Sequence, residues 1–341
     1  MPPLASLPRV AALLACTAAW PAAAADVAEL DPAAVLAQHG LARVDRVWVL
    51  ADELRLRRDL AELPKRRERL LAVEHDLDQR IEKNRQRWQE AQPAIAALRQ
   101  SLARLGSEDP QRQLLAQQID ALAAAAAEPT KIGAKSEVRS RVLVWIDERN
   151  SLASALASIR GTIGRLGELY EQLAQTPGVA EALRQIGDKN RLGPQRSLAA
   201  DRERLSEYEK VTYTPWVPIF FQGAQLRLTA LIDDLTPVTF TWIDSGGPGI
   251  ILTRTAAEAA GLKIPAAAPQ EAVAISPQKR TTAWRINVAR LRLGKCVLQD
   301  ASVLVLPPEA EDWGCQLSRE ALSGHALRLE PERLRLSIDA G

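Results

Sequence analysis

The sequence predicts an α+β protein of several parts, in which an N-terminal all-α antiparallel helical hairpin or coiled coil precedes a small all-β barrel. Apolar residues recur at alternating spacings of three and four from Leu70 to Leu105 and again from Val138 to Leu173, as in packed helices. From Val211 onward the apolar residues recur with a period of two, which indicates strands. The length of 341 residues suits two domains.

The composition gives few hints of a partner. The chain has 44 basic and 42 acidic side chains, a formal net charge of +2, which gives no argument for nucleic acid. The three histidines are scattered and there is no glycine-rich phosphate loop. We therefore expect neither a metal nor an organic cofactor.

Residues 1–25 are predicted to form a signal peptide. Arg9 precedes the apolar stretch 10–19, and four alanines precede Asp26, so we expect cleavage after Ala25 and a periplasmic or cell-envelope location. A competing interpretation is a lipoprotein signal at residues 13–16, which would attach a lipid to Cys16 and so hold the protein at a membrane. No later stretch reaches the roughly 20 apolar residues that a membrane span needs.

Residues 26–69 are predicted to form a short helix and strand before the hairpin. Asp31 followed by Pro32 predicts a helix start and Gly40 its end. A strand is expected over 46–50, followed by a helix capped by Asp52.

The helical hairpin is placed at residues 70–175. Pro93 is expected to kink the first arm, and a shorter helix over 111–126 joins the two arms. Folding back within the chain is favoured, and coiling between chains remains the competing arrangement. Arg149 interrupts the second apolar stripe. Three glycines spaced by three residues on the second arm either admit another helix or are tolerated in a well-packed coil: Gly161, Gly164 and Gly167.

A helical linker is predicted over 176–210, with helices at 179–186 and up to about Lys210.

The all-β domain is placed at 211–341. Its first hairpin turns at Gln222-Gly223, and a short helix is expected over 318–323. Further strands are expected at 238–243, 284–293, 297–306 and 334–338. Within this domain Cys296 and Cys315 either form a disulfide or remain one buried and one exposed thiol.

The triplet Asp244-Ser245-Gly246 follows an apolar strand and occurs once in the chain. Asp-Ser-Gly-Gly-Pro also occurs around the nucleophile of trypsin-like serine proteases, which would make Ser245 a nucleophile. That mechanism needs a histidine base, which precedes the nucleophile in those enzymes. Here His39 and His75 lie in helical sequence and His325 comes later, so this reading is disfavoured.

The order of elements in residues 240–262 resembles the catalytic loop of the retropepsin-like aspartic proteases. An apolar strand enters Asp-Ser-Gly, and a second apolar run and a short helix ending at Gly261 follow. Residues 325–338 resemble the closing hairpin of the bacterial members. The resemblance covers about 211–338 and leaves out the helical region.

The resemblance implies a peptidase. Asp244 would be the catalytic carboxylate, and one such residue per chain would require a homodimer acting on peptide or protein substrates. Ser245 would brace the loops across the dimer, Gly246 would allow the tight turn, and Trp242 is expected to pack beneath the loop.

A different class of function is a non-catalytic peptide-binding module on a degenerate barrel with a coiled-coil spacer. The stretch 271–283, at the place of the family's glycine-rich flap, contains no glycine. Of the two apolar residues and glycine that the family places before its short C-terminal helix, we match only the glycine, to Gly314.

Overall fold

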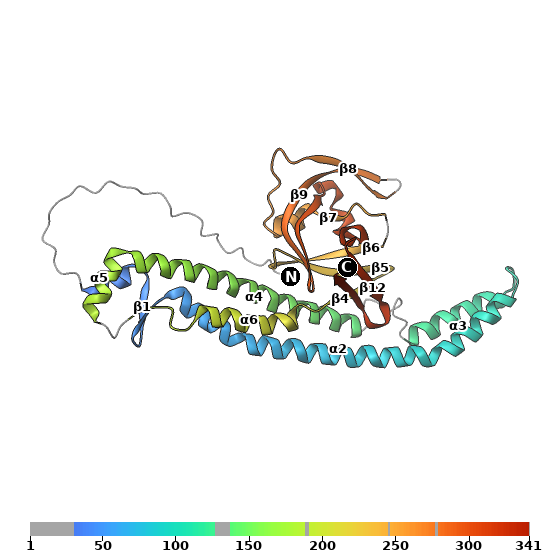
Figure 1. The fold of residues 1–341 in the computed structure, drawn as a ribbon. Helices are drawn as coiled ribbons and strands as arrows, with labels where there is room; N and C mark the ends of the chain where they lie inside the picture. Colours follow the sequence, from blue (N-terminus) through green and yellow to red (C-terminus); the bar gives the residue numbers. More distant parts are fainter. Residues whose placement is uncertain (1–30, 127–136, 188–190, 245, 277–278, 341) are drawn as a thin grey trace, which may run out of the picture.

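The computed structural model describes residues 31–126, 137–187, 191–244, 246–276 and 279–340. The predicted signal peptide, Cys16 and Ser245 lie outside these residues. An elongated helical arm carries a β domain on one side (Figure 1). Several helices with a β barrel in the C-terminal part confirm the α+β class.

The N-terminal elements form a small cap at one end of the arm. In α1 (Pro32–Gln38), Asp31 is the N-cap, and its carboxylate accepts a hydrogen bond from the Ala33 backbone N–H, as the sequence predicts. The sequence analysis expected a single strand next. The structure instead has an antiparallel hairpin of β1 (Leu41–Val44) and β2 (Val47–Leu50), with β3 (Arg191–Leu192) parallel to β2.

The first long helix, α2, runs from Ala51 to Arg104. Starting the arm at Leu70 was therefore wrong. The buried residues Leu56, Leu60 and Leu63 continue the same apolar seam toward the N-terminus, and the helix runs on through Pro64. Figure 1 shows that α2 curves toward its C-terminal end, the part that contains Pro93.

Two helices pack against different parts of α2. α3 (Gln111–Ala125) covers its C-terminal part, where Ile95, Ile119 and Ala123 form a separate core. α4 (Glu137–Gln175) runs antiparallel to the rest. Three contacts fix this direction: Arg141 pairs with Asp76, Arg66 contacts Ser151, and Tyr170 contacts Glu53. The helix over 111–126, which was predicted only to join the two arms, is thus itself a packing partner of α2.

A buried polar network ties the cap to the arm. Glu53 is fully buried, and its carboxylate accepts hydrogen bonds from the Tyr170 hydroxyl at 2.6 Å and from the Gln195 backbone N–H at 2.9 Å. It also pairs with Arg57, which in turn contacts Asp201. The remaining helices of this region are α5 (Pro177–Ile186) and α6 (Leu198–Thr212).

The β domain begins with β4 (Trp216–Gln222), five residues later than the period-two pattern suggested. Val211 and Thr212 still belong to α6, where the Thr212 hydroxyl donates to the Tyr208 carbonyl. The hairpin of β4 and β5 (Gln225–Ile232) turns at Gly223, as predicted. The elements that follow are β6 (Thr236–Ile243), β7 (Ile250–Leu252), α7 (Arg254–Ala259), β8 (Gln270–Ser276), β9 (Lys279–Leu293), β10 (Cys296–Val305), η2 (Pro308–Trp313), β11 (Gln316–Ser318), η3 (Arg319–Leu322), β12 (His325–Glu330), η4 (Pro331–Arg333) and β13 (Arg335–Ala340).

Six strands close into a barrel. They are ordered β5-β6-β11-β7-β10-β9, and β9 pairs again with β5 to complete the ring. β4, β13 and β12 extend the sheet beyond β5, and β8 extends it beyond β9. Closure removes the unpaired edges of those six strands and leaves the apolar side chains of their inner faces to fill the core.

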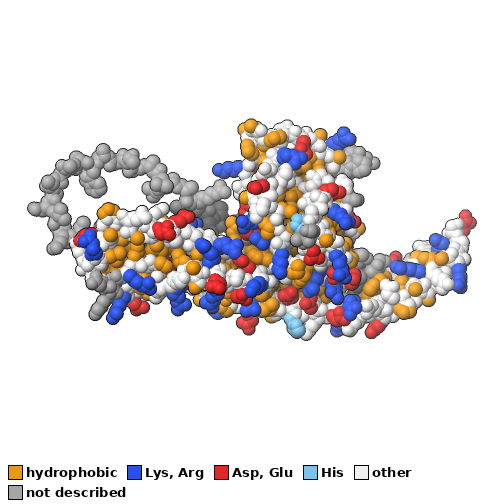
Figure 2. Space-filling model, in the orientation of Figure 1, with side chains coloured by type: hydrophobic (Ala, Val, Ile, Leu, Met, Phe, Trp, Pro, Cys, Tyr) orange, Lys and Arg blue, Asp and Glu red, His pale blue; other side chains and the backbone are white. Residues whose placement is uncertain are grey.

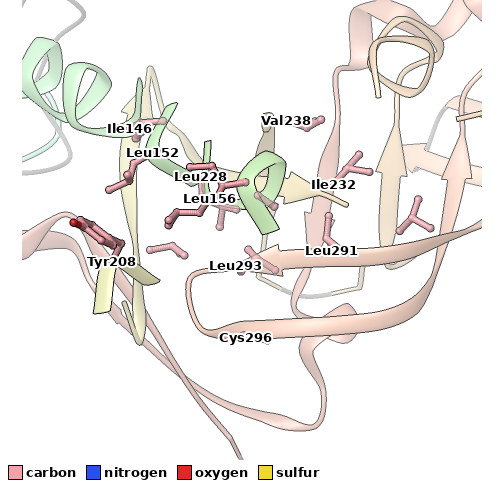
Figure 3. Packing of buried hydrophobic residues seen from close by; sticks show 14 of the residues in the cluster. Ile146, Leu152, Leu156, Tyr208, Leu228, Ile232, Val238, Leu291, Leu293 and Cys296 are labelled. Atoms are coloured by element: carbon pink, nitrogen blue, oxygen red, sulfur yellow. The ribbon is translucent and has the colours of Figure 1, made fainter. Parts of the chain in front are cut away.

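The arm and the barrel share one hydrophobic core. Leu152 and Leu156 of α4 belong to the same hydrophobic cluster as Leu228 of β5 and Leu293 of β9, as Figure 3 shows. Trp145 of α4 stacks on Trp216 of β4 with ring centroids 5.2 Å apart. On the surface, basic and acidic side chains are interspersed over both parts in the view of Figure 2.

Arg149 of α4 lies inside this shared core. Its side chain is 2% exposed, and its guanidinium lies 5.4 Å from the Trp145 ring. Among the described residues it forms no ion pair with a carboxylate, and its Nε has no hydrogen-bond partner. Burial lowers the pKa of Arg149 to about 10, and the like charge of Arg292 acts in the same direction. The interruption of the apolar stripe is thus a buried charge at the junction of arm and barrel.

Replacing this charge with an apolar side chain of similar length should stabilise the protein. We predict that Arg149→Met raises the free energy of unfolding by about 1–3 kcal/mol, because this buried charge has lost its hydration and gains no carboxylate partner among the described residues. Chemical denaturation followed by circular dichroism would measure it. Arg165→Met, on an exposed part of the same helix, should change stability by no more than about 0.5 kcal/mol. If Arg149→Met instead lowers the free energy of unfolding, the contacts of the guanidinium stabilise the protein by more than its desolvation destabilises it.

Candidate active site

Asp244 directly follows β6, at the point where the strand enters the loop 244–249. Its side chain is 76% exposed, and the carboxylate lies 3.8 Å from the Arg319 guanidinium. Gly246 has a φ of +70°, a left-handed conformation that favours glycine, as the tight turn requires. Trp242, two residues before Asp244, is buried. The structure therefore presents Asp244 at the surface, at the end of a buried strand.

A third strand separates the two strands that flank this loop. β11 lies between β6 and β7, parallel to β6 and antiparallel to β7. The loop must therefore cross the end of β11 to join its neighbours. This crossing brings residues 318–320, distant in sequence, beneath the loop that contains Asp244.

Ser318, the last residue of β11, forms the floor of the loop. It is 1% exposed and pairs with Ile243. Its hydroxyl accepts a hydrogen bond from the Gly249 backbone N–H at 3.1 Å, and its own N–H donates to the Gly249 carbonyl at 2.8 Å. A Cβ on Gly247 would lie only 2.3 Å from the Ser318 Cβ. Gly247 is thus required by close packing, whereas Gly246 is required by backbone conformation.

The prediction that Gly314 occupies the place of the family's C-terminal glycine is wrong. The residue that precedes the short helix η3 and lies against the loop is Ser318. Gly314 ends η2 instead, with a φ of +66°. In Leu317-Ser318 a serine stands where the family pattern has glycine, so the pattern is not recognisable there from glycine alone. The short helix that follows was the available signal.

The next two residues of η3 contact the loop as well. Arg319 pairs with Asp244, and the Glu320 carboxylate accepts a hydrogen bond from the Gly246 backbone N–H at 2.8 Å. Hydrogen bonds from the backbone N–H groups of Glu320 itself and of Gly246, and from the Ser318 side chain, hold the pKa of the Glu320 carboxyl below its usual range. Ser318, Arg319 and Glu320 were not predicted from the sequence as parts of the site.

The helix after β7 lies close to the loop and follows the prediction. Thr253 is the N-cap of α7, and its hydroxyl accepts a hydrogen bond from the Ala256 backbone N–H. Thr253 also donates its backbone N–H to the Cys315 sulfur at 3.4 Å. Burial raises the pKa of the Cys315 thiol.

The two cysteines are free and occupy different places. Cys315 lies against Thr253, whereas the Cys296 sulfur lies 3.3 Å from the His325 imidazole Nε2. Both thiols are buried, so neither alternative from the sequence, a disulfide or one exposed thiol, describes them. Across the described ranges no three His, Cys, Asp or Glu side chains gather as metal ligands would, and no helix there is long and apolar enough to cross a membrane.

Comparison with known proteins supports the resemblance for the barrel. Residues 228–321 match the family model described as aspartyl protease. The match begins in β5 and ends in η3, so it includes the loop with Asp244 and the residues 318–320 beneath it. No curated protein and no solved structure matches the chain. The comparison thus supports an aspartyl protease domain in the C-terminal part and does not extend to the helical arm.

The contact between Gly247 and Ser318 can be tested with a double-mutant cycle. We predict that Gly247→Ala lowers the free energy of unfolding by about 1–3 kcal/mol, because the added methyl group overlaps the Ser318 side chain. Ser318→Gly should relieve part of that loss when the two are combined, which denaturation of the four proteins would measure. Gly324→Ala is the control, because a Cβ there meets nothing within 4 Å. Strictly additive effects would contradict the close packing.

Proposed function

We propose that the protein is an exported, homodimeric, retropepsin-like aspartic endopeptidase in which each chain supplies Asp244. The single observation that carries this proposal is the exposed Asp244 at the end of β6, within a domain that matches the aspartyl protease family. The chain has one Asp-Ser-Gly triplet, so a pair of such aspartates needs two chains. A closed dimer with a two-fold axis is the arrangement that brings identical residues together.

The chemistry follows from two carboxyl groups that share one proton. Like charges held close together do not both ionise, so one Asp244 stays protonated while the other is a carboxylate. The carboxylate accepts a proton from a water molecule, whose oxygen attacks the peptide carbonyl carbon, while the protonated partner donates to the carbonyl oxygen. Proton transfer to the leaving nitrogen then accompanies cleavage of the C–N bond. The pair titrates as a unit, so its two pKa values belong to neither residue alone.

Removing the Asp244 carboxylate should abolish hydrolysis. We expect purified mature protein to cleave members of a mixed peptide library between about pH 3 and 7, and Asp244→Asn to lower the rate about a hundredfold or more, because the amide cannot act as a base. Mass spectrometry of the products would measure this. Asp312→Asn, an exposed carboxylate in η2, should cleave like the wild type. Equal cleavage by the Asp244→Asn protein would assign the activity elsewhere.

Subunit mixing tests whether one site needs two chains. When wild-type protein is mixed with an equal amount of Asp244→Asn and allowed to exchange, random pairing leaves about one quarter of the dimers fully wild type. The activity per wild-type chain should therefore fall to about half. Mixing with Asp312→Asn should leave it unchanged. If the activity per wild-type chain does not change when Asp244→Asn chains are added, the site is complete within one chain.

The alternative of a non-catalytic binding module has one observation in its favour. Arg319 lies within ion-pair distance of Asp244, so the Asp244 carboxylate already has a charged partner within its own chain. In that case peptides would bind without cleavage at any pH, and Asp244→Asn would retain the binding.

We also propose that the protein is exported. The proposal rests on the sequence features of residues 1–25, with the lipid-anchored form through Cys16 as the competing arrangement. A periplasmic or envelope location suits a peptidase that acts on exported peptides or proteins.

A further inference from the structure

We propose that Glu320 is a positioning residue that organises the Asp244 loop from within its own chain, before two chains meet. The catalytic part of this inference rests on the proposed peptidase function, whereas the bracing itself does not. The resemblance led us to expect that the Ser245 hydroxyl would hold the loop by a hydrogen bond across the dimer. In the structure the Glu320 carboxylate holds the loop by a hydrogen bond within one chain, and we call this contact the brace.

The brace joins two segments that are 74 residues apart in sequence. Oε1 of Glu320 accepts the Gly246 N–H at 2.8 Å, and the Gly247 N–H lies close enough to lower the pKa of the same carboxyl. Hydrogen bonds to an ionised acceptor are stronger than those between neutral groups. The Glu320 carboxylate therefore restrains the backbone directly after the turn that presents Asp244.

The segment that contains Glu320 is held in place by the barrel. Glu320 lies in η3, which directly follows β11, and β11 is held between β6 and β7 in the barrel. Ser318, at the end of β11, fixes the other end of the loop through both of its hydrogen bonds to Gly249. The loop is thus held at Gly246 by Glu320 and at Gly249 by Ser318, with Gly247 packed between them.

This arrangement also directs one backbone donor away from the reacting group. The Gly246 N–H points to Glu320, and within the described residues the Asp244 carboxylate pairs with the Arg319 guanidinium, at 3.8 Å. Asp244 therefore stays exposed and available to water and to a second carboxylate while its backbone is restrained. Preorganisation of this kind lowers the cost of assembling a site when two chains associate.

The brace should depend on pH with a definite sign. The pKa of Glu320 is lowered in the folded protein, so its contribution is present above the ordinary glutamate value and is lost as the pH falls through the lowered value. The groups that act on this carboxyl are its own backbone N–H, the Gly246 and Gly247 N–H groups and the Ser318 side chain. We therefore expect the loop to loosen only at the acid end of the range in which the Asp244 pair would act.

Amide hydrogen exchange tests the brace without requiring any activity. The experiment uses the full mature chain carrying Asp244→Asn, with and without Glu320→Ala or Glu320→Gln. We expect exchange at the Gly246 and Gly247 amides to accelerate about fivefold in Glu320→Ala and less in Glu320→Gln, because the amide oxygen can still accept a weaker hydrogen bond. The control is Glu309→Ala, an exposed glutamate in the first turn of η2, which should leave both amides unchanged. Unchanged exchange in Glu320→Ala would overturn the proposal.

Kinetics in the chain with Asp244 intact then test the catalytic part. Glu320→Ala should lower kcat with little change in KM or in the dimer dissociation constant measured by sedimentation, and Glu320→Gln should restore part of kcat. Glutamine does not titrate. The fall in kcat of Glu320→Gln at the acid end of the pH range should therefore lack the part that is due to protonation of Glu320. A variant that changes only the dimer dissociation constant would overturn the positioning role. If the wild-type chain cleaves no peptide, the proposed function fails, yet the exchange result still decides whether Glu320 braces the loop.

Discussion

The insertion of β11 between β6 and β7 is the constraint on which the candidate site depends. Two strands joined by a six-residue loop would ordinarily pair with each other, and here a third strand occupies the space between them. The loop must therefore pass over the end of β11, and its backbone polar groups need partners that a simple hairpin would supply by itself. Ser318 and Glu320 supply them. The exposure of Asp244 and the need for glycine at 246 and 247 both follow from this crossing.

The closed ring of six strands makes that insertion stable. The pairing of β5 with β9 closes the barrel, so β11 lies in a sheet without a free edge next to the loop. Leu317 of β11 and Ile250 of β7 are both buried in the barrel core. A shift of β11 by one residue would turn Leu317 outward and Ser318 inward. The hydrophobic core therefore sets the register that places Ser318 and Glu320 against the loop.

The helical arm is joined to this barrel by apolar and aromatic contacts rather than by a flexible linker. The stack of Trp145 on Trp216 and the Arg335 guanidinium 3.9 Å above the Trp216 ring lie at this junction. Arg335 also pairs with Asp78 of α2 at 2.6 Å. Arg149 is the exception, because its charge is buried there and pairs with no carboxylate of the described residues. The arm and the barrel therefore pack against each other through a shared core and not only through the connecting chain.

The sequence by itself determined which part of the chain is helical, which part is built of strands, and where the turn with Asp244 lies. The period of the apolar residues separated helices from strands, and Asp244 with Gly246 was recognisable because an apolar strand, a turn and a second apolar run follow one another locally. The start of α2 and the pairing of α3 with its C-terminal part were missed, because apolar spacing shows that a face is buried but does not show against what. The role of residues 318–320 was decided only by the tertiary structure. Their contacts with the loop join segments about 70 residues apart and arise from the order of strands in a closed barrel, which no local pattern of residues encodes.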